Sequence, residues 1–326
     1  MMTADRASPI GRVLPQMTLG TGAPGDPTAP PSPLPTPMTP AERAHERFSL
    51  SGNAIVTGGA GDPGFAVSKA VLEHGVRGLM VFDVDPIEAE AKISILETEF
   101  PDVRIRFLKV DITDEAAVDT AVAQTVSLLG PVTTLLNFAG MVPCRHALDW
   151  MPKDWNRVLN ANTIGAFFVA RAVARHMIVH KTGGSMVFVA GISAHQVDFP
   201  QSQAPYNVSK VGVKAMVRSL AGEWARYGIR VNSISPGYMD TILNEGDGPE
   251  DKREAWLSQH PLGRMGRPDE LCGAVVMLAS RAGSYFNGSD RELPSLLFVS
   301  PSSTIDRSRD GSSSLLLAYL KQKWSR

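Results

Sequence analysis

The chain has 326 residues, 43% of them hydrophobic, and a formal net charge of -1 at pH 7. This length can bury one large hydrophobic core, and the near-neutral charge gives no electrostatic basis for binding nucleic acid or an acidic membrane surface. The two cysteines, Cys144 and Cys272, form no CxxC pair, which argues against a disulfide framework or a thiolate zinc site and fits a reducing compartment. No apolar run reaches the roughly 18 residues that span a bilayer. We therefore expect a cytoplasmic protein with no membrane or nucleic-acid partner.

The first 47 residues differ in composition from the rest of the chain. Eight of the seventeen residues from Pro24 to Pro40 are proline. Proline at this density disfavours helix and sheet and favours an extended, solvated chain. We therefore expect residues 1–47 to form a disordered tail.

Strand and helix patterns alternate from residue 48 to about residue 290. Short apolar runs are typical of strands covered on both faces, and they occur at Ala54–Gly58, Leu79–Asp83, Val103–Val110, Leu135–Gly140, Ser185–Ala190 and Ile229–Ser235. Stretches with a helical pattern lie between them, among them Pro63–His74, Asp114–Leu129 and Trp155–His180. This alternation predicts a single α/β domain with a Rossmann-like, doubly wound parallel sheet.

The first predicted strand runs into a glycine-rich turn before a helix, and this turn contains Thr57, Gly58, Gly59 and Gly64. Such a turn lets backbone N–H groups approach a pyrophosphate at the helix N-terminus, although the glycines alone would also fit an ordinary turn. Asp83 ends the second strand, 19 residues after Gly64. A carboxylate there can accept hydrogen bonds from the ribose hydroxyls and repels a 2′-phosphate. We therefore expect NAD(H) as the cofactor, with NADP(H) as the alternative.

Two residues of the same turn oppose phosphate binding. Asp62 places an anionic side chain beside the expected phosphate. Pro63 removes one backbone donor, although proline suits the first turn of a helix sterically. We expect both residues to weaken the binding of a dinucleotide.

Tyr206 and Lys210 lie four residues apart in a long helical pattern and therefore share one helix face. A free tyrosine has a pKa near ~10 and is a poor base at neutral pH. A nearby ammonium favours the phenolate, so Tyr206 can exchange a proton with a substrate oxygen during hydride transfer. Ser193 lies 13 residues before Tyr206, just after a predicted strand, and its hydroxyl can hold the same oxygen. Taken alone, Tyr206 could equally be a partly buried core tyrosine.

Together these residues resemble the short-chain dehydrogenase/reductase family over roughly residues 48–290. The turn at Thr57–Gly64 looks like the family's phosphate-binding turn, and Tyr206 with Lys210 matches its YxxxK motif. The resemblance implies that Tyr206 and Lys210 contact the cofactor, and that Asn162 holds a water that relays protons from Lys210. It implies further cofactor contacts from Asp111, Asn137, Ala139, Gly140, Pro236, Gly237 and Thr241.

Two stretches, 199–207 and 261–268, look like the fungal group of sorbose reductases, mannitol dehydrogenases and arabinitol dehydrogenases. This resemblance implies an oxidoreductase that transfers a hydride between NAD(P)(H) and a secondary alcohol or ketone, with a polyol or ketose as its small-molecule substrate. A ketoreductase of secondary metabolism is an alternative within the same family. His195, Gln201 and Gln203 are further candidates for lining the substrate pocket.

The chain departs from the family after Asp290. Nine of the 36 residues from 291 to 326 are serine, and neither the family's last strand nor its Asp-Gly-Gly stretch is recognisable. We therefore expect an atypical Ser-rich tail from residue 291 and an unpaired sheet edge. The loss would also weaken any homo-oligomer and leaves the activity in doubt. A catalytically impaired, nucleotide-binding scaffold is consequently the alternative to an active enzyme.

Overall fold

The computed structural model describes residues 15–197, 201–241 and 262–293. The chain divides into two units, of which the first comprises Met1–Gly248 and Met265–Ser295. The second comprises Pro249–Arg264 and Leu296–Arg326, and only residues 262–264 of it are described. All the described helices and strands belong to the first unit.

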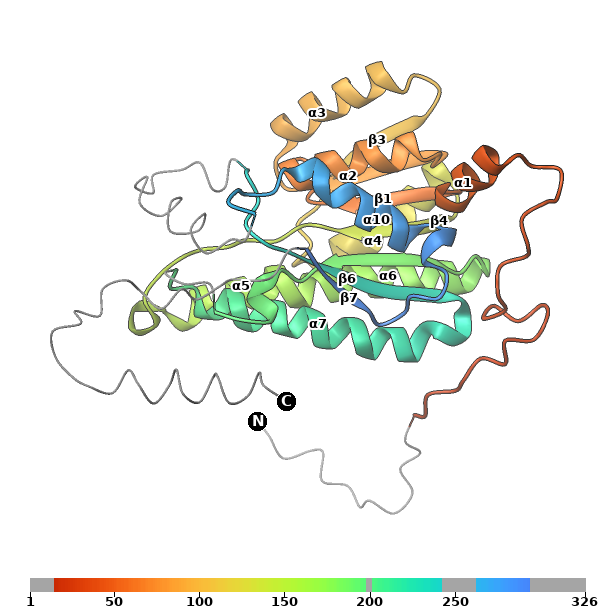
Figure 1. Ribbon diagram of the computed structural model, residues 1–326. Helices are drawn as coiled ribbons and strands as arrows, with labels where there is room; N and C mark the ends of the chain where they lie inside the picture. The colour runs from red at the N-terminus through yellow and green to blue at the C-terminus, as the bar shows by residue number, and fades with distance from the viewer. Residues whose placement is uncertain (1–14, 198–200, 242–261, 294–326) are drawn as a thin grey trace, which may run out of the picture. The chain divides into compact units, whose positions relative to one another are not determined.

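A seven-stranded parallel sheet with the order β3-β2-β1-β4-β5-β6-β7 forms the centre of the first unit (Figure 1). Its strands are β1 (Asn53–Thr57), β2 (Gly78–Asp83), β3 (Arg104–Lys109), β4 (Val132–Asn137), β5 (Gly184–Val189), β6 (Ile229–Pro236) and β7 (Asp290–Leu293). The strand order reverses between β1 and β4, and ligands of doubly wound sheets bind in the crevice at such a reversal. The predicted Rossmann-like parallel sheet is therefore confirmed.

Helices pack on both faces of this sheet. One face is covered by α2 (Asp62–Glu73), α3 (Pro86–Glu99) and α10 (Cys272–Ala279), and the other by α4 (Glu115–Leu129), α6 (Gly165–His180) and α7 (Ala204–Trp224). Successive residues of β1 alternate between the two hydrophobic cores: Ile55 faces one, while Ala54 and Val56 face the other. Because both faces of the sheet are covered, the strand sequences are nearly continuous apolar runs and do not alternate between apolar and polar residues.

The predicted helix Trp155–His180 contains a π-helical turn. It runs as α5 (Pro152–Leu159), the π turn η2 (Asn160–Ile164) and then α6. Such turns widen the helix locally and are frequent at functional sites. Here the turn carries the buried Asn162. The described residues also form the short 3₁₀ turns η1 (Ala147–Asp149), η3 (Ile192–Ala194), η4 (Ala225–Tyr227), η5 (Pro268–Leu271) and η6 (Arg281–Gly283).

The segment before the sheet is not extended throughout. Helix α1 (Pro40–Phe48) begins inside the stretch that the proline content suggested would be an extended tail. The Thr39 side chain accepts from the backbone N–H of Glu42, and the Glu42 side chain accepts from that of Thr39. This reciprocal capping box starts the helix, and Pro40 occupies the first helical position, where no N–H is needed.

The prediction that the sheet lacks its last strand is wrong. Residues Asp290–Leu293 form β7, which pairs in parallel with β6 from Ser233 to Pro236. The N–H of Gly237 also donates to the carbonyl of Leu293, at 2.7 Å. Sequence inspection missed β7 because an edge strand pairs through its backbone and needs no apolar run. The boundary expected at residue 290 therefore falls within a strand, and residues 294–326 lie outside the described part of the chain.

The remainder of the β6 edge is also paired. The side chain of Asn287 accepts from the N–H of Val231 at 2.9 Å, and the N–H of Gly288 donates to the carbonyl of Val231 at 2.8 Å. The Asn232 amide donates to the carbonyl of Phe286, at 2.9 Å. The loop before β7 therefore pairs the backbone N–H and carbonyl of Val231, which β7 itself does not reach.

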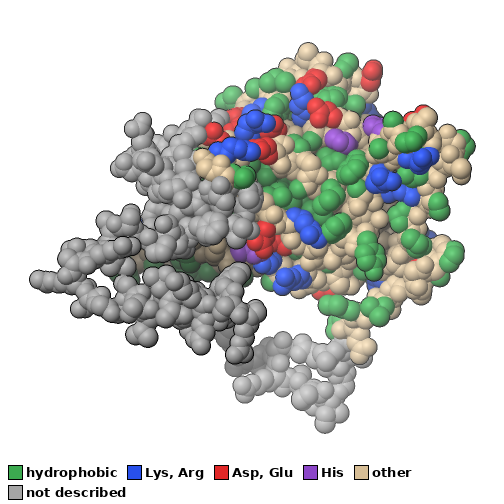
Figure 2. Space-filling view, in the orientation of Figure 1, with side chains coloured by type: hydrophobic (Ala, Val, Ile, Leu, Met, Phe, Trp, Pro, Cys, Tyr) green, Lys and Arg blue, Asp and Glu red, His purple; other side chains and the backbone are tan. Residues whose placement is uncertain are grey.

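The described surface mixes charges of both signs. Figure 2 shows acidic and basic side chains lying close together on the face in view, in keeping with the net charge of -1. Within the described ranges, no helix is both long and apolar enough to cross a membrane.

Candidate active site

Two adjoining cavities open at the carboxyl edge of the sheet. The first, a groove, lies against the ends of β1, β2, β3 and β4 and the helix α5. The second, a pocket, lies against the ends of β5 and β6 and the start of α7. Pro63, Phe138, Gly140 and Met141 line both cavities. An elongated ligand can therefore run from the groove into the pocket.

The glycine-rich turn between β1 and α2 forms one wall of the groove. Gly58 has a φ of +68°, and a Cβ added to it would lie 2.7 Å from the backbone nitrogen of Ala139. A Cβ on Gly64 would lie 2.0 Å from the carbonyl oxygen of Gly58. Side chains are thus excluded at both positions, and the backbone of the turn stays open to the groove at the start of α2. This cradle fits a dinucleotide pyrophosphate at a helix N-terminus.

Asp62 does not stand beside the turn as an isolated negative charge. Lys92 on α3 lies with its Nζ 3.1 Å from Asp62 Oδ1 and also donates to the carbonyl of Ala60, at 2.5 Å. Pro63 is the second residue of α2, where the missing N–H costs no helical hydrogen bond. The charge of Asp62 is therefore partly compensated within the fold, and Pro63 does not disturb the helix, although the backbone donor that it removes is not replaced.

Asp83 joins the end of β2 to the glycine-rich turn. Its Oδ2 accepts from the N–H of Ala60 at 2.9 Å, and its Oδ1 accepts from the N–H of Val84 at 2.7 Å. Asp83 lines the groove, as does Asp111 after β3. Asp111 Oδ1 accepts from both the N–H and the hydroxyl of Thr113, at 2.9 and 2.7 Å. The two carboxylates are thus fixed at the part of the groove formed by β2 and β3.

Thr57 and Asn137 lie behind the groove and not in it. The Thr57 hydroxyl donates to Asn137 Oδ1 at 2.9 Å and accepts from the N–H of Ala139 at 3.2 Å. The Asn137 amide donates to the carbonyl of Ala166, at 3.3 Å. Both side chains are buried, so they hold the ends of β1 and β4 together and position Gly58 and Ala139 for a ligand.

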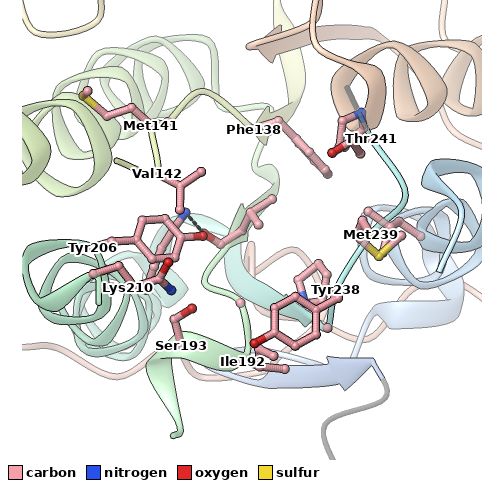
Figure 3. Close-up of a pocket in the computed structure, with 18 of the residues that line it drawn as sticks. Phe138, Met141, Val142, Ile192, Ser193, Tyr206, Lys210, Tyr238, Met239 and Thr241 are labelled. Atoms are coloured by element: carbon pink, nitrogen blue, oxygen red, sulfur yellow. Dashed lines mark hydrogen bonds between the residues drawn. The ribbon is translucent and has the colours of Figure 1, made fainter. Parts of the chain in front are cut away.

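Helix α7 brings Tyr206 and Lys210 to the pocket. Figure 3 shows both side chains with Ser193 on one side of the pocket, and Met239 and Thr241 across it. Lys210 Nζ lies 5.4 Å from the centre of the Tyr206 ring. It donates to the carbonyl of Val189 at the end of β5, at 2.8 Å. Because α7 begins at Ala204, the first turn of the helix places the phenol directly at the carboxyl edge.

Burial lowers the pKa of Lys210 from its ordinary value of 10.5 to about 8. The residue is 6% exposed, and desolvation penalises the ammonium more than the neutral amine. The ammonium still predominates at neutral pH. Its charge is therefore available to stabilise a Tyr206 phenolate in surroundings that screen it weakly.

Ser193 lies in the 3₁₀ turn η3, which follows β5. The turn starts after Gly191, whose φ of +94° belongs to the left-handed region that favours glycine. A Cβ on Gly191 would lie 3.9 Å from the hydroxyl of Tyr206. The Ser193 turn and the Tyr206 hydroxyl are consequently neighbours in the fold.

Asn162 supports this side of the site from the π turn. Its Oδ1 accepts from the N–H of Met141 at 2.8 Å, and its Nδ2 donates to the carbonyl of Met141 and to the hydroxyl of Ser209, each at 2.9 Å. A Cβ on Gly140 would lie 3.1 Å from Asn162 Oδ1 and 3.8 Å from Lys210 Nζ. Asn162 therefore ties the segment after β4 to α7, on the same side of Gly140 as Lys210.

The sequence of the chain matches a family profile described as enoyl-(acyl carrier protein) reductase over residues 63–291. An NADP-dependent mannitol dehydrogenase from Hypocrea jecorina is 36% identical over 261 residues, which cover 79% of this chain and 96% of that protein. The chain belongs to the short-chain dehydrogenase/reductase family. A sorbose reductase from Candida albicans is 34% identical to this short-chain dehydrogenase/reductase, over 79% of this chain and 92% of that protein.

Solved structures agree with this membership. A gluconate 5-dehydrogenase from Burkholderia cenocepacia, crystallised with NADP and tartrate, superposes with a TM-score of 0.72 at 29% identity. The match covers 78% of this short-chain dehydrogenase/reductase and 98% of that chain. The predicted resemblance to the family, including its sorbose reductase and mannitol dehydrogenase group, is therefore confirmed.

The structure distributes the residues predicted for the site among three places. The groove is lined by Gly58, Gly64, Asp83, Asp111, Ala139 and Gly140. The pocket is lined by Gly140, Ser193, Tyr206, Lys210, Pro236, Gly237 and Thr241. Neither cavity is lined by Thr57, Gly59, Asn137 or Asn162.

Several lining residues carry no signal that could have revealed them from the sequence. Val84 and Ile112 line the groove, and Val142, Ile192 and Tyr238 line the pocket. They are apolar or aromatic residues that follow strands, and many such residues pack in a core. Gln201 and Gln203, which were candidates from the sequence, do line the pocket, whereas His195 does not.

Proposed function

We propose that this short-chain dehydrogenase/reductase transfers a hydride between NAD(P)(H) and a secondary alcohol or ketone, with a polyol or ketose as substrate. The proposal is carried by one observation: Ser193, Tyr206 and Lys210 line a single pocket that adjoins the dinucleotide groove. The names of the two relatives, a mannitol dehydrogenase and a sorbose reductase, favour the polyol and ketose class. Gln201 and Gln203 in the pocket supply amide groups that can bond substrate hydroxyls.

The nicotinamide ring, when bound, supplies or accepts the hydride. In the direction of reduction, the Tyr206 hydroxyl gives its proton to the substrate oxygen as the carbonyl carbon is reduced. In the direction of oxidation, the Tyr206 phenolate removes the proton of the substrate hydroxyl. The Lys210 ammonium stabilises that phenolate, and the Ser193 hydroxyl holds the substrate oxygen. Asn162 acts from behind Gly140, where it supports a proton relay from Lys210.

The residues present fit a nicotinamide dinucleotide. The open glycine-rich turn would hold the pyrophosphate, and Asp83 and Asp111 would bind the adenosine end. Tyr206 and Lys210 would hold the nicotinamide ribose. The further residues that we propose for the cofactor site, by contact or by positioning the backbone, are Thr57, Gly58, Gly59, Gly64, Asn137, Ala139, Gly140, Pro236, Gly237 and Thr241.

We expect Asp83 to control the choice between the two cofactors. Among the residues that the structure describes, Asp83 forms no ion pair with a Lys or Arg, and Lys92 on α3 is engaged by Asp62, Glu88 and Ala60. The carboxylate would therefore repel a 2′-phosphate. Replacing Asp83 with asparagine should lower the ratio of the Kd for NADPH to the Kd for NADH by about tenfold, or ~1.4 kcal/mol. Quenching of protein fluorescence by each cofactor measures both constants.

Asp111→Asn is the matched control for the Asp83 variant. It removes one negative charge from the same groove, but at the end of β3 instead of β2. We expect it to change the two dissociation constants by similar factors. An unchanged ratio in Asp83→Asn would contradict the role of this carboxylate. It would also leave NADP(H), the cofactor named for the mannitol dehydrogenase, as the better candidate.

The proposal is tested by an activity screen. The purified full-length protein is incubated with NADH or NADPH and a panel of ketoses, other ketones and aromatic ketones, and with the oxidised cofactors and polyols. We expect turnover with at least one ketose or polyol, followed at the absorbance of the reduced nicotinamide. Activity on aromatic ketones alone would favour a ketoreductase of secondary metabolism. Cofactor binding without any turnover would favour the scaffold alternative.

Two features of the sequence that suggested an impaired scaffold, Asp62 and the missing last strand, do not support that alternative in the folded protein. Asp62 has an ion-pair partner in Lys92, and β7 pairs with the edge of the sheet. Both favour an active enzyme. We further propose that the protein acts in the cytoplasm on a small molecule, and that residues 48–290 together with the rest of β7 form the catalytic domain.

A further inference from the structure

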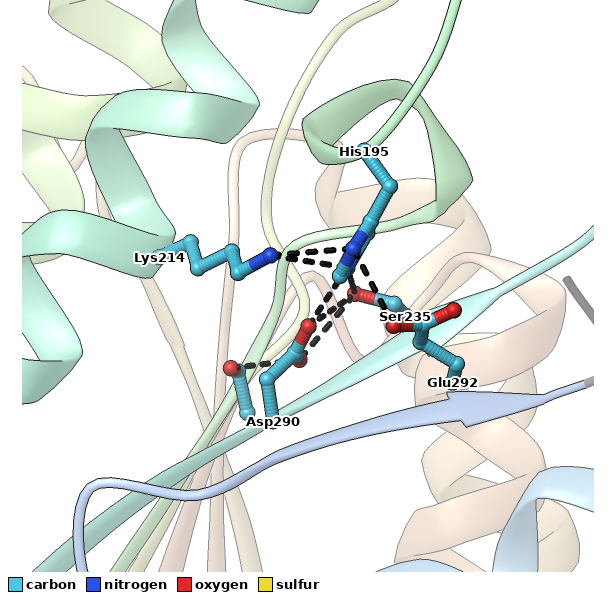
Figure 4. A network of polar contacts seen from close by, with 6 residues as sticks. His195, Lys214, Ser235, Asp290 and Glu292 are labelled. Atoms are coloured by element: carbon cyan, nitrogen blue, oxygen red, sulfur yellow. Dashed lines mark hydrogen bonds and ion pairs between the residues drawn. The ribbon is translucent and has the colours of Figure 1, made fainter.

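A cluster of polar side chains, which we call the His195 network, lies beside the turn that carries Ser193 (Figure 4). The cluster joins four elements that are far apart in the sequence. Its members are His195 directly after η3, Lys214 on α7, Ser233 and Ser235 on β6, and Asp290 and Glu292 on β7. None of them belongs to the proposed catalytic set.

Asp290 is the centre of the His195 network. Its side chain is 7% exposed, and Oδ2 lies 2.7 Å from His195 Nε2. The hydroxyls of Ser233 and Ser235 donate to the same carboxylate, at 2.7 and 2.8 Å. A carboxylate this deeply buried is stable only when its oxygens are hydrogen-bonded. Asp290 therefore fastens β7 to β6 and holds the imidazole of His195 against the sheet.

The contacts of His195 fix the orientation of its ring. Lys214 Nζ lies 2.9 Å from Nδ1, and an ammonium can only donate, whereas a carboxylate can only accept. Nε2, which faces the Asp290 carboxylate, therefore carries a proton and donates to it, while Nδ1 faces the Lys214 ammonium. Glu292 Oε1, on a side chain that is 46% exposed, lies 3.2 Å from the same Nδ1. The imidazole is thus held from both of its nitrogens.

The turn that carries Ser193 is anchored at both ends to the same part of the sheet. Before the turn, the N–H of Ala190 donates to the carbonyl of Ile234 on β6, at 2.9 Å. Within it, the N–H groups of His195 and Gln196 donate to the carbonyl of Ile192, at 2.8 and 3.1 Å. After it, the His195 ring binds Asp290 and Ser235 on the neighbouring strands. Release of this ring would loosen the downstream end of the Ser193 turn.

We propose that His195 and Asp290 are positioning residues that fix Ser193 for its contact with the substrate oxygen. This inference rests on the proposed function, since it needs Ser193 to act on the substrate. Lys214 lies one helical turn after Lys210 on α7, so the network also fixes the Ser193 turn relative to the helix that carries Tyr206 and Lys210. A shift of about 1 Å between such groups can cost on the order of 100-fold in rate.

Two single variants and their combination test the proposal. Asp290→Asn and His195→Ala should each lower kcat by roughly tenfold or more, because Ser193 is no longer held in place. The Kd for NADH should stay within about twofold, because neither residue lines the groove. The double variant should lose little more activity than the more impaired single variant, because both changes break one interaction.

A rescue variant and a matched control separate positioning from general damage to the sheet. His195→Gln keeps an amide N–H that can donate to Asp290, and we expect its kcat to recover to within about threefold of the wild-type value. Arg291→Gln changes the next residue of β7, whose guanidinium contacts Ser289 and the Phe286 ring and not the network. This control should leave kcat within about twofold, even if it lowers the melting temperature.

Amide hydrogen exchange gives a readout that does not depend on activity. The backbone amides of residues 195 and 196 should exchange faster in Asp290→Asn and His195→Ala than in wild type, and at the wild-type rate in Arg291→Gln. Faster exchange in a protein without turnover on any substrate would support the anchoring and reject the proposed function. Unchanged exchange together with unchanged kcat would overturn the proposal. So would a loss of kcat in Arg291→Gln equal to that in Asp290→Asn. Should Asp290→Asn fail to fold, the two His195 variants decide in the same way.

Discussion

Replacing Tyr206 with phenylalanine is expected to lower kcat by roughly 10²- to 10⁴-fold, the range typical of general acid–base catalysis. The variant keeps the aromatic ring that packs at the start of α7 and loses only the hydroxyl that exchanges the proton. Binding of NADH should weaken by only a few-fold, because Lys210 still holds the nicotinamide ribose and most of the groove is formed by the ends of β1 to β4. Steady-state kinetics and cofactor fluorescence together measure the two effects.

Tyr227→Phe is the matched control for Tyr206→Phe. Tyr227 lies in η4 after the end of α7 and lines neither cavity. Removing its hydroxyl should therefore leave kcat within about twofold of wild type. Near-full activity in Tyr206→Phe would show that another group transfers the proton and would refute the proposed mechanism.

Replacing Lys210 with methionine is expected to abolish most of the activity and, at pH 7, to stabilise the protein. The ammonium that favours the Tyr206 phenolate is lost, so kcat should fall by about 100-fold or more. The folded protein no longer has to keep a charge in a buried site. The stability gain should be on the order of 1–3 kcal/mol, because the lost hydrogen bond to Val189 offsets about 1 kcal/mol of the relief from desolvation.

The stability effect of Lys210→Met depends on pH in a defined direction. Burial lowers the pKa of Lys210 from 10.5 to about 8. Between these two values the unfolded chain binds more protons at this site than the folded protein, so the unfolding free energy of wild type rises with pH. The destabilising effect of the buried charge is complete below about pH 8 and disappears as the pH approaches 10.5. The advantage of the methionine variant should shrink over the same window.

Urea unfolding of both proteins at pH 7, 9 and 10 would measure this difference. Equal stability of the two proteins at pH 7 would contradict the burial of a charged Lys210. A difference that stayed constant from pH 7 to pH 10 would contradict the lowered pKa. Neither result depends on the substrate, so the test can be carried out before any substrate is known.

The catalytic pair was predictable because its geometry is local. Tyr206 and Lys210 are four residues apart, and any α-helix places such residues on one face. Gly64 was predictable for a similar reason, since a Cβ there would meet the backbone of Gly58 and Gly59 in the same turn. In both cases a few consecutive residues set the geometry, and the rest of the chain has little influence on it.

The roles of Thr57, Asn137 and Asp62 were not predictable in the same way. The sequence predicted Thr57 and Asn137 as cofactor residues, but their side chains are hydrogen-bonded to each other, although the two residues are 80 positions apart in the chain. It marked Asp62 as a defect, but Lys92, 30 residues later, neutralises part of its charge. What a polar side chain does depends on its partner, and these partners come from other elements of the fold.

The amino-acid sequence by itself determined the alternation of strands and helices, the open phosphate turn and the Tyr206–Lys210 pair, because short-range backbone geometry sets each of them. Only the tertiary structure decided that residues 290–293 complete the sheet and that Asp290 meets His195, 95 positions earlier. An edge strand is selected by the free backbone groups of its neighbour and by buried side-chain partners such as Ser233 and Ser235. Those groups lie on β6, far from residues 290–293 in the sequence. No local pattern in residues 290–293 can therefore predict this pairing.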